Sequence, residues 1–264
     1  MLSNNQIKIY SSLRIKKYRD THHKFLAEGE KIALDIINSP SCIFKIQKLI
    51  ASPEFLKENI FPTLKGIPEV VEASDEMLRK ISSLSTPNKA ILVCELPEYT
   101  PDFKEVSGEL SLFLDDIRDP GNLGTIIRTA DWFGIHHIFC SQESVDVYNP
   151  KVVQATMGAL CRVKVYYMET SLLLTELGKI DSFPFIGTLL EGDNIYTSEL
   201  PFRGIIILGN ESRGISEKLQ AALNYRLTIP SQANRSERSE SLNVATAAAV
   251  VMAEFRRRQF SYSK

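Results

Sequence analysis

The chain has 264 residues, of which 44% are hydrophobic and 24% are charged, and its formal net charge is −1. This length favours two folded domains, and the composition is typical of a globular protein rather than a disordered chain. The near-neutral charge excludes binding to nucleic acid through overall positive charge, although cations gather before Phe25 and at residues 256–258.

The first part of the sequence predicts short alternating elements. Helices are expected from about residue 5, over 30–37, near Glu54 and over 75–82, where Ser74 is the N-cap. Strands are expected over 24–27, 43–50, 69–73 and 90–95. Pro97 and Pro101 mark a stretch with few apolar residues. We therefore predict a small α/β domain over residues 1–96, a linker over 97–108 and a second domain over 109–264.

The second part has a regular strand–helix rhythm. Strands are predicted over 110–114, 136–140, 163–167, 183–188, 204–208 and 226–229. Helices are predicted over 123–133, 151–157, 171–177, 216–223 and 242–257. Strands separated by helices favour a mostly parallel sheet covered on both faces. Ligands of such sheets bind at the carboxyl ends of the strands, so the loops there are the candidate sites.

The first such loop covers residues 115–124. Asp119 is a suitable helix cap, Pro120 suits the first helical position, and Arg128 follows Gly124 by one turn. Taken alone, this pattern also fits an ordinary capped helix with a surface arginine.

The second loop covers residues 208–214 and follows a buried strand. Gly209 and Gly214 flank Glu211, a pattern that fits either close approach of a ligand or a tight structural turn. The loop has neither the Gly-Lys-Ser/Thr of a phosphate-binding loop nor the Gly-x-Ser-x-Gly of a nucleophile elbow.

The third loop leads from residues 229–230 into a helix rich in small residues. Ser241 is the candidate cap of this helix. Asn243 is harder to explain by helix propensity, because asparagine competes with the backbone for hydrogen bonds.

In this order, the three loops resemble the SpoU family, also called TrmH, of RNA ribose 2′-O-methyltransferases in the SPOUT superfamily. The resemblance covers roughly residues 110–255, and the preceding part looks like the ribosomal-protein-like α/β sandwich that binds substrate in many members. It implies a trefoil-knot fold, S-adenosylmethionine as cofactor, RNA as substrate and a homodimer. The alternative is an RNA-binding protein of this fold without methyl transfer. An ordinary dinucleotide-binding enzyme is disfavoured because no GxGxxG follows a predicted strand.

The resemblance also carries site residues onto this sequence. Its implied catalytic residues are Arg128, Asn122, Glu211, Ser241 and Asn243. Its implied cofactor-binding residues are Gly209, Asn210, Ile229 and Leu242, with Leu189 as a weaker candidate. One departure is the stretch 231–240, which is longer, more polar and free of glycine compared with the short connection of many members.

The role of Arg128 stays open at this point. The family assigns it the part of general base, yet a charged guanidinium has no lone pair to accept a proton. The alternative is that Arg128 orients the 2′-hydroxyl and the adjacent phosphate. Asn122 would position the ribose, and Glu211 would hold Asn122 or Arg128.

The remaining expectations concern partners and location. The four cysteines lie far apart and no signal core precedes them, which favours reduced thiols and a cytoplasmic protein without membrane spans. The histidines form two adjacent pairs without ligand spacing, so no metal is expected and the histidines are placed at surfaces or strand ends. RNA contacts are expected from the basic first helix, through Arg14, Lys16, Lys17 and Arg19. Whether the RNA is ribosomal or transfer RNA stays open.

Overall fold

The computed structural model describes residues 2–58, 66–233 and 240–262. The chain folds into two compact units. One consists of Met1–Tyr99 with Asp146–Arg162, and the other of Thr100–Val145 with Val163–Lys264. The stretch expected as a linker contains a short helix, α6 (Phe103–Ser107), which Asp102 caps.

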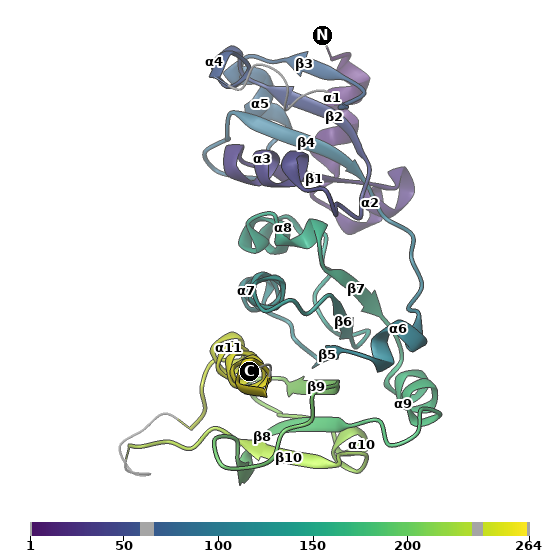
Figure 1. Cartoon of the computed structure of the whole chain (residues 1–264). Helices are drawn as coiled ribbons and strands as arrows, with labels where there is room; N and C mark the ends of the chain where they lie inside the picture. The colour runs from purple at the N-terminus through teal and green to yellow at the C-terminus, as the bar shows by residue number, and fades with distance from the viewer. Residues whose placement is uncertain (1, 59–65, 234–239, 263–264) are drawn as a thin grey trace. The chain divides into compact units, whose positions relative to one another are not determined.

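The N-terminal unit contains a four-stranded sheet in the order β1-β4-β2-β3 (Figure 1). Its strands are β1 (Lys24–Glu28), β2 (Ile46–Ala51), β3 (Val70–Glu72) and β4 (Ala90–Glu95). Strand β4 runs antiparallel to β1 and β2, whereas β3 runs parallel to β2. The helices are α1 (Asn4–Ser12), α2 (Lys16–His22), α3 (Glu30–Asn38), α4 (Pro53–Glu58) and α5 (Asp75–Ile81). As predicted, the Ser74 side chain caps α5 by accepting from the backbone of Met77.

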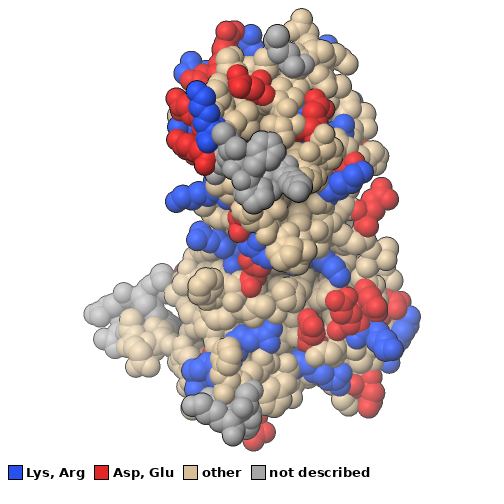
Figure 2. Space-filling view, turned by 45° about the horizontal axis from the view of Figure 1, so that its top comes forward, with Lys and Arg blue, Asp and Glu red and all other residues tan. Residues whose placement is uncertain are grey.

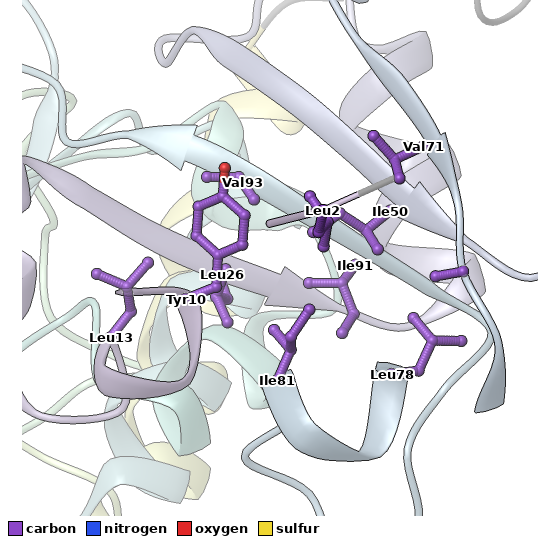
Figure 3. Close-up of a cluster of buried hydrophobic side chains, with 11 residues drawn as sticks. Leu2, Tyr10, Leu13, Leu26, Ile50, Val71, Leu78, Ile81, Ile91 and Val93 are labelled. Atoms are coloured by element: carbon purple, nitrogen blue, oxygen red, sulfur yellow. The ribbon is translucent and has the colours of Figure 1, made fainter. Parts of the chain in front are cut away.

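Apolar side chains from α1, α5 and the strands form a core in this unit (Figure 3). Leu78 and Ile81 are three residues apart and therefore lie on one face of α5. Ile91 and Val93 are two apart on β4 and therefore lie on the same face of the sheet. The other buried members are Leu2, Tyr10, Leu13, Leu26, Ile50, Val71 and Ala73.

The predicted basic helix is two helices, because α1 ends at Ser12, with the buried Leu13 as its C-cap, and α2 begins at Lys16. The expectation that Arg19 contacts RNA is wrong. Its side chain is only 3% exposed, donates to the carbonyl of Leu13 at 2.8 Å and pairs with Asp146. Burial of an arginine requires such partners, which occupy the groups that a phosphate would need.

Two short helical segments that follow Asp146 complete the N-terminal unit. They are α8 (Pro150–Thr156) and the 3-10 helix η1 (Ala159–Cys161). Asn149 caps α8 through its side chain, and the carbonyl of Cys161 accepts from the backbone of Ile43 at 2.8 Å. Arg162 donates to Asp35 at 3.0 Å.

The C-terminal unit contains a six-stranded sheet in the order β10-β8-β9-β5-β6-β7, in which all neighbours are parallel. Its strands are β5 (Leu110–Asp115), β6 (His137–Cys140), β7 (Lys164–Tyr167), β8 (Phe185–Asn194), β9 (Gly204–Gly209) and β10 (Tyr225–Thr228). Its helices are α6, α7 (Pro120–Trp132), α9 (Thr170–Gly178), α10 (Glu217–Gln220) and α11 (Val244–Tyr262). The predicted α/β class with a parallel sheet is confirmed.

Helices cover this sheet on both sides (Figure 1). Helices α7 and α11 pack against each other, and α6 packs against α9 on the opposite side of the strands. Buried residues of α11 include Ala248, Val251 and Phe255, so part of its apolar surface is used within the unit. Helix α11 also contacts β9, the strand that leads into one of the candidate loops.

The arginines near the end of α11 also make contacts within the protein. Arg256 donates to the carbonyls of Phe133 and Gly134 at 2.7 Å each. Arg257 and Arg258 both donate to Glu254, which is buried. Arg256 therefore holds the helix in place, and Arg257 and Arg258 pair with Glu254, although the side chain of Arg257 is 63% exposed. On the face drawn in Figure 2, basic and acidic side chains are intermingled.

Within the described residues, no helix is long and apolar enough to cross a membrane. Within the same residues, no group of three histidine, cysteine, aspartate or glutamate side chains is placed to hold a metal. All four cysteines are free thiols, and three of them are buried. His137 begins β6, as expected for a strand end, but it is fully buried and stacks on Tyr166.

Candidate active site

Three loops meet at the carboxyl edge of the parallel sheet. Strands β5 and β9 are neighbours in which Asp115 lies in register with Gly209, so the loops that follow them start side by side. The third loop follows β10 and leads into α11. Of the stretch 231–240, residues 234–239 lie outside the described ranges.

A cavity of about 1100 Å³ opens beside these loops. Its walls come from the end of β8, the loop after β9, the end of β10 and the start of α11. All five predicted cofactor-binding residues line it, as do two of the predicted catalytic ones: Leu189, Gly209, Asn210, Ile229 and Leu242, with Glu211 and Ser241.

Asn122 joins the three loops through its side-chain amide. Its Nδ2 donates to Oε1 of Glu211 at 2.5 Å, and its Oδ1 accepts from Nδ2 of Asn243 at 2.9 Å. One amide can do both because it carries a donor and an acceptor on separate atoms. The backbone N–H of Asn122 also donates to Asp119, the predicted cap of α7, at 2.8 Å. The side chain of Asn122 is therefore fixed from both sides at the start of the helix.

Asn243 is the N-cap of α11. Its Oδ1 accepts from the backbone N–H groups of Ala245 at 3.0 Å and Thr246 at 3.3 Å, which leaves Nδ2 to donate to Asn122. The expectation that Ser241 caps this helix is wrong, because the helix starts two residues later than that role requires. Asparagine is a favoured N-cap, which accounts for the residue that helix propensity left unexplained.

Glu211 sits in a tight turn that two glycines make possible. The backbone groups of Asn210 and Gly214 exchange hydrogen bonds of 3.1 and 2.8 Å across the turn. A Cβ atom on Gly209 would lie 2.2 Å from the carbonyl carbon of Gly214. Glycine is thus required at position 209 because another segment of the protein's own backbone passes close to it. The interpretation as a tight structural turn is confirmed, and the turn also lines the cavity.

The side chain of Asn210 braces this turn. Its Oδ1 accepts from the backbone N–H groups of Ser212 at 2.9 Å and Arg213 at 3.2 Å, and its Nδ2 donates to the carbonyl of Asp116 at 2.8 Å. All of its polar groups are therefore engaged with the protein. Asn210 lines the cavity, and its side chain stabilises the turn.

Sequence reasoning missed the roles of Asp115, which ends β5, and of Asp116, which follows it. Asp115 is buried, and its Oδ2 accepts from the backbone of Ser216 at 2.8 Å, which ties the strand to the far end of the second loop. Asp116 has a left-handed backbone with φ +58°, and its N–H donates to Oγ of Ser141 at 2.9 Å. Two adjacent acidic residues at a strand end indicate a possible functional role, but the sequence does not reveal which groups they bond to.

Of the predicted catalytic residues, Ser241 shares only the cavity wall with Glu211, and Arg128 neither lines the cavity nor contacts the others in the described part of the chain. It lies on the exposed side of α7, and in the described part of the chain its guanidinium has no hydrogen bond or ion pair. Trp132 lies four residues further on the same face of the helix and is 84% exposed. The structure thus brings together Asn122, Glu211 and Asn243 and leaves Arg128 facing outward.

The cavity includes a wall that the sequence did not predict. Strand β8 continues to Asn194 instead of ending near residue 188, because its second half pairs with β10 after a register shift. This extension contributes Leu190 and Glu191 to the cavity. Gly192 lets β10 pass, because a Cβ there would lie 2.5 Å from the carbonyl oxygen of Arg226.

Comparisons with known proteins bear on this site. The family model "SpoU rRNA Methylase family" matches residues 109–253, and "MRM3-like substrate binding domain" matches residues 4–92. The chain is 28% identical over 262 residues to the 23S rRNA (guanosine(2553)-2′-O)-methyltransferase RlmP of Bacillus subtilis, with 96% of each chain covered.

Solved structures give the same result. A protein described as an RNA methyltransferase of the TrmH family from Porphyromonas gingivalis is 40% identical, with a TM-score of 0.84 and coverage of 98% of this chain and 99% of that one. An AdoMet-bound rRNA methyltransferase from Sinorhizobium meliloti is 28% identical, with a TM-score of 0.79 and coverage of 98% and 96%. The resemblance inferred from the three loops is confirmed, and the chain belongs to the SpoU rRNA Methylase family.

Proposed function

We propose that this protein transfers a methyl group from S-adenosylmethionine to a ribose 2′-hydroxyl of ribosomal RNA. The observation that carries the proposal is the position of Asn122, which bonds both Glu211 and Asn243 beside the cavity. Family membership supports the reaction, and the relative from Bacillus subtilis acts on 23S rRNA by its name. Transfer RNA is the alternative substrate.

The cavity fits the proposed cofactor in size and in lining. Its volume of about 1100 Å³ is ample for one small ligand, since such sites commonly measure about 300–1,000 Å³. Leu189, Ile229 and Leu242 offer apolar surface for an adenine ring, and the turn at Gly209 offers backbone polar groups. When bound, S-adenosylmethionine supplies a methyl group that the positive sulfur has already activated.

The residues of the chain then have to position the ribose and accept or share the proton of its 2′-hydroxyl. We assign Asn122 to the ribose and Glu211 to holding Asn122, in line with their hydrogen bond. Asn243 fixes the other side of Asn122, and Ser241 borders the cavity. In-line positioning of a bound hydroxyl is a large part of such catalysis.

We assign Arg128 to orienting the 2′-hydroxyl and the neighbouring phosphate. A charged guanidinium donates hydrogen bonds but cannot accept a proton. Replacement of Arg128 by Lys keeps the charge and loses the planar donor geometry, so turnover should fall at neutral pH. Near-full turnover of the lysine variant would rule out a specific role for the guanidinium.

We also propose a homodimer that covers the exposed face of α7. Trp132 is 84% exposed and Phe260, on α11, is 75% exposed, and large exposed aromatic side chains are typical of interfaces. A second copy on this face would cover Trp132 and bring polar groups towards Arg128. This would complete a site that one chain leaves open.

Three finer points of the family resemblance remain proposals. The C-terminal segment would pass through a loop to form the trefoil knot, in keeping with the insertion of β9 between β5 and β8. Residues 1–96 would bind RNA, with Arg14, Lys16 and Lys17 as contacts, although Lys16 also pairs with Asp20 at 2.8 Å. A cytoplasmic location would suit the four free thiols.

Incubation with labelled S-adenosylmethionine tests the proposed reaction. The RNA should be ribosomal RNA from a strain that lacks the gene, and primer extension at low nucleotide concentration would locate the methylated ribose. Asn122→Ala should abolish transfer while the variant still folds. Methyl transfer to a base, or to transfer RNA alone, would overturn the proposal as stated.

A further inference from the structure

A single carboxylate lies between two exposed guanidinium groups at the candidate active site. Nε of Arg118 donates to Oδ1 of Asp116 at 2.6 Å, and a terminal nitrogen of Arg213 lies 4.0 Å from Oδ2 of the same carboxylate. The side chains of Arg118 and Arg213 are 59% and 75% exposed, whereas that of Asp116 is 15% exposed. The cations therefore face solvent, and the anion lies beneath them.

This cluster belongs to the frame of the active site. Arg213 lines the cavity and follows Glu211 by two residues in the same turn. The carbonyl of Asp116 accepts from Asn210, which braces that turn, and the N–H of Asp116 donates to Ser141. A group bound by the two arginines would thus be held in a defined position relative to Glu211.

Some guanidinium N–H groups of this cluster have no hydrogen-bond acceptor within the described residues. Within the described residues, the guanidinium of Arg213 has no hydrogen bond, since 4.0 Å is too long for one. The hydrogen bond that Arg118 donates to Asp116, with a smaller contribution from the charge of Glu143, raises the pKa of Arg118. The nearby Asp115, Asp119 and Glu211 accept from Ser216, Asn122 and Asn122, respectively. Two guanidinium groups therefore share one carboxylate, which leaves one positive charge unpaired within the cluster itself, beside a cavity that Glu191, Glu211 and Glu240 also line.

We propose that Arg118 and Arg213 form a phosphate clamp for the RNA backbone beside the nucleotide that is methylated. The inference rests on the proposed function, because it places the substrate at this cavity. Guanidinium groups present planar donor pairs that match phosphate oxygens. Asp116 holds Arg118 in an orientation suitable for this contact and balances part of the charge when RNA is absent.

The alternative is an ordinary solvated ion pair, and the two differ in what the arginines do for RNA. An exposed pair contributes only about 0–1 kcal/mol to folding, so both arginines can be replaced with little effect on stability. A phosphate contact, in contrast, contributes to affinity and to its dependence on salt. Binding and stability can therefore be separated in one variant.

The test uses the full-length protein with both arginines changed, Arg118→Gln and Arg213→Gln. Affinity for a ribosomal RNA fragment that wild type binds is measured by fluorescence anisotropy across a salt series. We expect about a tenfold loss of RNA affinity near 0.15 M salt and a salt slope smaller by about 1 to 2. The KM for RNA should rise similarly, while the Tm stays within about 2 °C.

Two further variants make the result specific. Lys179→Gln removes one exposed cation, which pairs with Glu176 at the C-terminal end of α9. This end of α9 leads to the edge of the sheet opposite the candidate site, so the variant should leave RNA affinity unchanged. Arg118→Lys with Arg213→Lys keeps both charges, so the salt slope should persist while affinity drops only partly.

The proposal is overturned if the double glutamine variant binds RNA with wild-type affinity and slope. It is also overturned if Lys179→Gln causes an equal loss, because the effect would then be general. If wild type binds ribosomal RNA but transfers no methyl group, the proposed function fails, and the binding measurements on the same fragment still decide the clamp.

Discussion

The Nδ2 atom of Asn122 donates to Oε1 of Glu211 at 2.5 Å, across 89 residues of sequence. This bond connects the first turn of α7 to the loop after β9. Glu211→Gln removes the negative charge that favours the bond and should lower kcat by about 10- to 100-fold through misplacement of Asn122. Affinity for S-adenosylmethionine should change by less than about threefold. Single-turnover methylation and calorimetry separate the two quantities.

The matched control for that variant is Glu217→Gln, which removes an exposed carboxylate from α10 in the same unit. Its kcat should remain near wild type. Equal loss in both variants would mean that net charge, rather than the contact with Asn122, controls the rate.

Asn243 combines a cap with a contact to Asn122, and two substitutions separate these roles. Asn243→Asp keeps the oxygen that accepts from Ala245 and Thr246 but cannot donate to Asn122. Its stability should stay within about 0.5 kcal/mol of wild type, whereas Asn243→Ala should lose about 1 kcal/mol. Both variants should lose most of their activity. Urea unfolding and a methylation assay give the comparison, and a fully active aspartate variant would contradict it.

Gly209 should not tolerate a side chain. Its Cβ would lie 2.2 Å from backbone atoms of Gly214, so Gly209→Ala must open the turn that carries Glu211. We expect a loss of about 1–3 kcal/mol in the free energy of unfolding and weaker binding of S-adenosylmethionine. Gly178→Ala is the control, because nothing lies within 4 Å of the Cβ it would add. An unchanged Tm for Gly209→Ala would show that the turn can relax freely.

The ion pairs at Glu254 predict a specific loss of stability in acid. Hydrogen bonds from Arg257 and Arg258 lower the pKa of this buried carboxyl to about 2, from an ordinary value of 4.5. A depressed carboxyl pKa stabilises the folded state above the unfolded pKa, and this stabilisation is lost as the pH falls from 4.5 towards 2. At neutral pH, Glu254→Gln should therefore cost on the order of 3 kcal/mol. The difference from wild type in urea unfolding should shrink near pH 3, and a constant difference would contradict the assignment.

Trp132 offers a test of the proposed homodimer. Its side chain is 84% exposed on α7, so Trp132→Glu should leave the fold of one chain intact. The charge should shift the protein from dimer to monomer in sedimentation velocity and reduce methyl transfer, because Arg128 lies one turn away on the same face. Tyr196→Glu, at another exposed aromatic residue, is the control. A wild-type protein that is already an active monomer would end the proposal.

The sequence by itself determined the local structure around each loop. Asp119 and Pro120 predicted the start of α7, and Ser74 predicted the start of α5, because capping depends on residues that are near each other along the chain. The alternation of apolar strands and helices predicted the parallel sheet and hence the edge where the loops meet. The three loops together were sufficient to indicate the family.

Only the tertiary structure decided which groups the loops hold. The charge of Arg19 is visible in the sequence, but its burial against Asp146 is not, since these residues are separated by 127 positions. The same applies to Asn122, whose partners Glu211 and Asn243 become neighbours once β5 pairs with β9. Propensity and periodicity are short-range properties, whereas a side chain's hydrogen-bond partners depend on the strands that the folded sheet places beside each other.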